Sequence, residues 1–174
     1  MCLLCDFKAS RRQVLRSGMA SLAAVGLAAN AQVDVGPPST LRKLVSAEQI
    51  EGVAAKQYTQ MMASAQEQRA LYPVNHPQVR RLREIARRLV PHSQAWNPNA
   101  KDWQWEINLI HSDQINAFCM PGGKIAFYSG ILDTLKLSND ETAMIMGHEM
   151  AHALREHARA QMGKGSATSW GLRI

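Results

Sequence analysis

His148-Glu149-Met150-Ala151-His152 is the stretch on which the interpretation of this 174-residue chain depends. Two histidines four positions apart lie on the same side of an α-helix, because one turn takes about 3.6 residues. Their imidazoles can then bind one zinc ion together, and Glu149 beside them can accept a proton from water. The stretch therefore predicts His148 and His152 as metal ligands and Glu149 as the catalytic base.

The residues that precede this stretch predict the same helix independently. Ser138 and Glu141 have the spacing of a capping box, in which each side chain satisfies a backbone N–H of the other residue. The apolar run Ala143–Met146 follows, and we expect all of it to pack in the core. A helix from about Asn139 to about Arg159 is the result.

Short extended segments come before this helix. Residues 103–110, 116–120 and 124–128 alternate between apolar and polar side chains or are mostly apolar, which favours strands. Pro121-Gly122-Gly123 predicts a turn between the second and third strands. Helices are expected over about 46–70, 77–90 and 130–135. The order of these elements predicts an α+β fold, mainly helical, with a small antiparallel sheet before the motif helix.

The N-terminal residues have the pattern of an export signal. Arg11 and Arg12 form the adjacent pair of a twin-arginine signal, the run 18–29 is apolar, and Ala29-Asn30-Ala31 fits a cleavage site. A basic, Ala-rich disordered tail is the alternative. We expect residues 1–31 to be the signal, 32–45 a linker and 46–174 the folded portion, in a periplasmic or otherwise exported protein.

Composition excludes some classes of protein. A hydrophobic content of 46% with 20% charged residues is typical of a globular chain. Residues 1–31 supply half of the net charge of +6, so the folded portion gives no argument for nucleic-acid binding. Five arginines on the predicted helix 77–90 favour a solvated face; peripheral contact with anionic lipid is the minority alternative. Cys119 is expected to be a buried, inert thiol.

Residues 116–132 read NAFCMPGGKIAFYSGIL, and GHEMAH and His157 follow. Together they resemble the Oma-type and HtpX-type zinc metalloendopeptidases, which are related to the CAAX prenyl proteases. The similarity covers about residues 46–165. It implies a zincin-like fold, one Zn²⁺ per chain in a gluzincin site, and polypeptide substrates among misfolded or misassembled envelope proteins. Strand 124–128 is expected to be the sheet edge with which an extended substrate pairs.

The resemblance also implies a third zinc ligand, a glutamate from a later helix. Residues 164–174 contain no Asp, Glu or His, so we expect the chain to be C-terminally truncated. Glu156, one turn after His152, is a strained candidate. The metzincin pattern fails because Arg155 and Ala158 stand where it needs Gly and His. The alternative function is a catalytically incomplete remnant that at most binds other proteins; the oligomeric state stays open.

The export signal can be tested directly. We expect replacement of both Arg11 and Arg12 by Lys to trap the precursor in the cytoplasm, because a twin-arginine signal requires the guanidinium pair. Cell fractionation followed by immunoblotting measures the exported share. Unchanged periplasmic recovery would contradict the twin-arginine assignment and leave a general secretory route.

Overall fold

The structure is a computed structural model that describes residues 36–169. The predicted signal, with its arginine pair, lies outside the described residues. Six of the seven predicted helices and strands begin within two residues of their predicted start. The elements in chain order are η1 (Thr40–Leu44), α2 (Ala47–Glu67), α3 (Pro77–Leu89), η2 (Val90–Ala95), η3 (Pro98–Lys101), β1 (Glu106–Ile110), β2 (Ala117–Met120), β3 (Lys124–Tyr128), α4 (Ser129–Leu135), α5 (Asn139–Leu154) and α6 (His157–Ser169).

The sheet has the strand order β1-β3-β2. β2 and β3 form an antiparallel hairpin whose turn contains Gly122 and Gly123, both with positive φ, a backbone conformation that suits glycine. β1 and β3 run parallel, so the prediction of an antiparallel sheet is wrong for this pair. β3 is the central strand, so the prediction that 124–128 forms a sheet edge is also wrong. β2 is an edge of the sheet instead.

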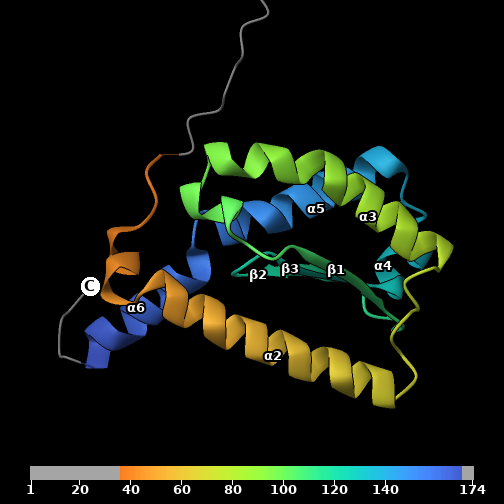
Figure 1. Ribbon diagram of the computed structural model, residues 1–174, viewed down its shortest axis with the longest axis horizontal. Helices are drawn as coiled ribbons and strands as arrows, with labels where there is room; N and C mark the ends of the chain where they lie inside the picture. Colours follow the sequence, from red (N-terminus) through yellow and green to blue (C-terminus); the bar gives the residue numbers. More distant parts are fainter. Residues whose placement is uncertain (1–35, 170–174) are drawn as a thin grey trace, which may run out of the picture. The chain divides into compact units, whose positions relative to one another are not determined.

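Helices cover both faces of the sheet (Figure 1). On one face, α3 and α5 pack against inward side chains such as Leu109, Ile125 and Phe127. On the other, α2 packs against Ile110 and Ala126, because side chains alternate between the two faces of a strand. The α+β class predicted from the sequence is confirmed. None of the helices in residues 36–169 is long and apolar enough to span a membrane.

A buried tyrosine joins α2 to the central strand. Tyr58 is 1% exposed, and its hydroxyl donates to the backbone oxygen of Ile125 at 2.6 Å. Asn108 of β1 donates to the same hydroxyl oxygen at 3.1 Å. Burial raises the pKa of Tyr58, so the hydroxyl stays protonated and keeps donating. The sheet and α2 are therefore held together by directed bonds as well as by apolar packing.

The first turn of α5 is tied to α3 by Arg81. Its guanidinium donates to Asn139 Oδ1 at 2.6 Å, to the backbone oxygen of Leu137 at 2.6 Å and to Thr142 Oγ1 at 2.9 Å. The capping box of Ser138 and Glu141 is present as predicted. This arginine is thus a structural contact, whereas the sequence interpretation placed it on a solvated face.

The apolar run of α5 does not face the core as a block. Met146 is completely buried, and Met150 on the same face is 3% exposed, whereas Met144 is 76% exposed. Ile145 is only half-buried. The expectation that the whole run Ala143–Met146 packs inside is therefore wrong, because helical periodicity turns Met144 outward, while Ala143 and Ile145 pack against the core only partly buried.

The motif helix also ends earlier than predicted. α5 stops at Leu154, and Glu156 has φ +57, the left-handed region that non-glycine residues rarely adopt. α6 then starts at His157, so a continuous helix to about Arg159 is wrong. The carboxylate of Glu156, whose side chain is 9% exposed, forms ion pairs with Arg42 of η1 and with Arg159 of α6. These charges hold the turn between the two helices.

η1 lies directly on α6. A Cβ at Gly163 would lie 2.0 Å from the carbonyl oxygen of Leu41, so only glycine allows this approach. Arg159 also donates from Nε to the backbone oxygen of Val45 at 2.6 Å. Residues 40–45, within the segment expected to be a linker, therefore contact the helix that follows the motif.

Core packing on α5 predicts a sharp contrast between two methionines. Met146→Ala should cost about 2–5 kcal/mol of unfolding free energy, because it leaves a cavity in a closed core. Met144→Ala, on the solvent side of the same helix, should change it by less than about 0.5 kcal/mol. Urea denaturation followed by circular dichroism measures both. Equal losses would mean that α5 is rotated from the orientation described.

The Glu156 ion pairs predict a second contrast. Glu156→Gln should cost about 3 kcal/mol, because it removes the charge from between two partly buried arginines. The matched control is Glu84→Gln, which breaks an exposed pair with Arg87 and should cost less than about 1 kcal/mol. Urea midpoints at low and high salt measure the difference. A Glu156→Gln loss no larger than the control would show that the pairs do not hold the turn.

Candidate active site

The two motif histidines lie together on the exposed side of α5. His148 Nε2 and His152 Nε2 are 3.1 Å apart, and their rings meet edge-on, with centroids 4.7 Å apart at 79°. The core contacts of Met146 and Met150 fix this orientation, because they point the opposite face of the helix inward. The predicted ligand pair is thus brought together with its two Nε2 atoms adjacent.

Glu149 lies beside this pair and near the edge strand β2. It is half-buried. Its charge acts on Cys119 of β2, where burial raises the pKa of the thiol and the nearby Glu149 carboxylate raises it further. Cys119 is therefore a protonated thiol, as expected of an inert cysteine, although it is half-buried where the sequence predicted a buried one. The predicted base is thus adjacent in sequence to His148 and has its carboxylate near Cys119 of β2.

The histidine pair fits a zinc ion. Two nitrogens bound to one tetrahedral zinc at about 2.0–2.1 Å lie about 3.3 Å apart, close to the 3.1 Å found here. Neutral imidazole nitrogens are also among the donors that zinc prefers. Within the described residues, no three His, Cys, Asp or Glu side chains are grouped so that they could hold a metal. The described part of the chain thus supplies two fitting donors.

Glu156, the strained candidate for a third ligand, points elsewhere. It is 8% exposed and its carboxylate is engaged by Arg42 and Arg159. The helix break before α6 is the reason, since a continuous helix would have kept Glu156 on the same side as His152. In this structure Glu156 therefore does not join the histidine pair as a third ligand.

His157 makes a contact that the sequence interpretation missed. Its Nδ1 lies 2.7 Å from Nδ1 of His152, with ring centroids 4.8 Å apart at 71°. Partial burial and the nearby charges of His152 and Arg155 lower the pKa of His157. The sequence shows a histidine five residues after His152. It does not show the break between α5 and α6, which brings the His157 side chain against the ring of His152.

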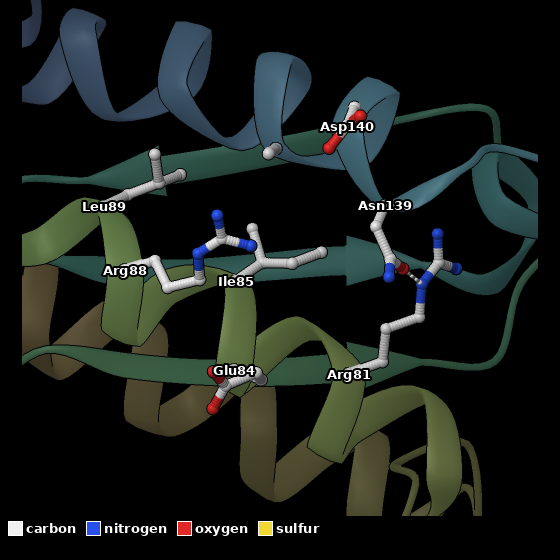
Figure 2. A pocket seen from close by; sticks show the side chains of 8 residues that line it. Arg81, Glu84, Ile85, Arg88, Leu89, Asn139 and Asp140 are labelled. Carbon is white, nitrogen blue, oxygen red and sulfur yellow. Dashed lines mark hydrogen bonds between the residues drawn. The ribbon is translucent and has the colours of Figure 1, made fainter.

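A separate pocket lies between α3 and the first turns of α5 (Figure 2). It has a volume of about 240 Å³, and Arg81, Arg88, Glu84 and Asp140 are among its lining residues. Figure 2 shows Arg81 bonded to Asn139 at one end of it. The motif histidines occupy the later turns of α5, so this pocket is not part of the histidine site.

Similarity to known proteins agrees with the geometry. The chain is 42% identical over 53 residues to mitochondrial metalloendopeptidase OMA1 of Arabidopsis thaliana, which is 30% of this chain and 11% of the relative. It is 29% identical over 115 residues to the OMA1 of Saccharomyces cerevisiae, 62% of this chain and 32% of the relative. It is 30% identical over 79 residues to metalloprotease LoiP of Escherichia coli, which is 45% of this chain and 31% of the relative.

The chain thus spans at most about a third of the length of these curated relatives. The model of the family described as "Peptidase family M48" matches residues 76–171, more than half of the chain and the part that contains α3, the sheet and the motif helix. The resemblance to zinc metalloendopeptidases seen in the sequence is thereby confirmed. The chain belongs to peptidase family M48.

Proposed function

We propose that this chain carries the motif-helix part of a zinc metalloendopeptidase with a zincin-like arrangement. The observation that carries the proposal is the 3.1 Å separation of His148 Nε2 and His152 Nε2 on the exposed face of α5. Membership of family M48 and the metalloprotease relatives support it. His148 and His152 are the proposed ligands of one Zn²⁺, and Glu149 is the proposed catalytic base.

Each proposed residue has a separate task. When bound, zinc polarises the scissile carbonyl and makes water more acidic. His148 and His152, one helical turn apart, would hold the ion through their Nε2 atoms. Glu149, adjacent in sequence but not a ligand, accepts the proton of the attacking water and passes it to the leaving amine. Its carboxylate acts on Cys119 of the edge strand β2, the strand with which a peptide would pair.

The proposed substrate is an extended segment of an unfolded polypeptide. β2 is an edge strand that borders α5, and within residues 36–169 its only strand neighbour is β3. An unpaired strand edge offers backbone N–H and C=O groups to an added strand. A peptide that pairs with β2 therefore lies along the edge of the sheet at which the Glu149 charge acts on Cys119. This preference for unfolded chains is consistent with misfolded or misassembled envelope proteins as substrates.

Export completes the proposal. Residues 1–31 would direct the chain to the periplasm, where misfolded envelope proteins are the proposed substrates. On the exposed side of α3, Arg80 and Arg88 remain available for the peripheral lipid contact considered from the sequence. The lipid contact is the weaker part of the proposal, since charge alone supports it.

Metal binding and catalysis are separable by mutation. Glu149→Gln should keep the zinc affinity of the chain, whereas His148→Ala should lose it, because only the histidine is a ligand. In a chain extended to the length of its relatives, Glu149→Gln should lower casein hydrolysis by about 10²–10⁴-fold, since an amide does not accept the proton. Chelator competition and release of peptides from casein measure the two effects.

The same variants test the alternative, a protein-binding remnant without catalysis. That alternative gains support if the extended wild-type chain releases no peptides from casein while still binding unfolded casein. Retention of full zinc affinity in His148→Ala would contradict the proposed site itself.

A further inference from the structure

His157 is the first residue of α6, yet it faces back onto the motif helix. In a continuous α-helix, residues five apart point roughly 140° away from each other around the axis. In such a helix the side chain of residue 157 would not reach Nδ1 of His152. Here the two Nδ1 atoms lie 2.7 Å apart, hydrogen-bond distance. The break between α5 and α6 is what creates the contact.

The break is strained and heavily supported. Glu156 has a left-handed backbone conformation, which is unfavourable for a residue with a Cβ. Its carboxylate is held by Arg42 and Arg159, and its backbone oxygen accepts from Ala160 N at 2.9 Å. Arg69 and Lys136 have the same conformation at the ends of α2 and α4, so the two arginine ion pairs are what distinguish the turn at Glu156. The residue placed by this turn is His157.

The two nitrogens of the His152 ring have different neighbours. Nε2 faces His148 Nε2 at 3.1 Å, and Nδ1 faces His157 Nδ1 at 2.7 Å. A neutral imidazole carries one proton, on one of its two nitrogens. A ring that binds metal through Nε2 must carry its proton on Nδ1, and that N–H needs an acceptor. His157 Nδ1 is at the position of that acceptor.

We propose that His157 is a positioning residue: it accepts the Nδ1–H bond of His152 and so fixes the tautomer and the ring orientation in which His152 Nε2 binds the metal. This inference rests on the proposed zinc site. His157 is not a third ligand, because it contacts the nitrogen of His152 that is directed away from His148. Glu156 and its two arginines act one step further out, by holding His157 in place.

The test measures zinc affinity and an NMR signature on the full 174-residue chain. His157→Ala removes the acceptor and should weaken zinc binding by about 10–100-fold, the usual effect of losing the hydrogen-bond partner of a metal-binding histidine. His157→Asn should restore most of the affinity, because its carbonyl oxygen can occupy the place of Nδ1. His92→Ala, an exposed histidine of η2, is the matched control and should bind like the wild type.

The NMR signature separates positioning from general damage to the fold. In the zinc-loaded wild type, the His152 Nδ1–H proton should be visible and slow to exchange with solvent. It should broaden or disappear in His157→Ala and return in His157→Asn, while backbone amide spectra of the three chains stay alike. If His157→Ala fails to fold, its amide signals will lose their dispersion. The zinc affinity and the Nδ1–H signal of His157→Asn then decide whether an acceptor at this position is needed.

Each outcome is informative. If His148→Ala loses zinc but His157→Ala binds as tightly as the wild type, the positioning role is overturned and the zinc site stands. If His157→Asn is as defective as His157→Ala, an acceptor at this point is not what matters, and the role is also overturned. If His148→Ala itself keeps wild-type affinity, the proposed metal site is wrong and the inference falls with it.

Discussion

α5 has to present two different faces, and the rest of the structure is built around that requirement. Met146, Met150 and Ala153 pack against α3 and the sheet. Because the helix turns by a fixed angle per residue, His148 and His152 then emerge on the opposite side. Arg81 fixes the start of the helix and the Glu156 ion pairs fix its end. The motif histidines are therefore oriented by burial on one face and by charges at both ends.

Local patterns in the sequence were sufficient to predict where most of the helices and strands begin. The capping boxes of Ser46 and Ser138 depend on residues only three apart, and both occur in the structure. The turn at Gly122-Gly123 is equally local, since its positive φ angles call for glycine. The shared face of His148 and His152 follows from helix geometry alone. Their roles as ligands, and that of Glu149 as base, remain predictions.

The features that sequence reasoning missed depend on distant residues. No glycine or proline marks the end of α5; Glu156 is held there by Arg42, which is 114 residues away in sequence. After β1 the chain first forms the far edge strand β2 and then returns as β3 between the two, so β3 runs parallel to β1. A pattern of alternating side chains does not encode this order of strands. The outward position of Met144 depends on where α3 and the sheet lie. Tertiary context decided each of these points.

The ion pair between η1 and Glu156 also joins two parts of the chain with very different expected stability. A five-residue 3₁₀ helix has few internal hydrogen bonds, so segments of this kind open with free energies far below that of global unfolding. Each opening of η1 takes Arg42 away from Glu156 and exposes the face of α6 that carries Gly163. Local unfolding at residues 40–44 is thereby coupled to the alignment of histidines more than a hundred residues later. As temperature rises, the rate of amide hydrogen exchange in η1 and the conformational disorder of the motif histidines should consequently increase together, because both report the same local opening.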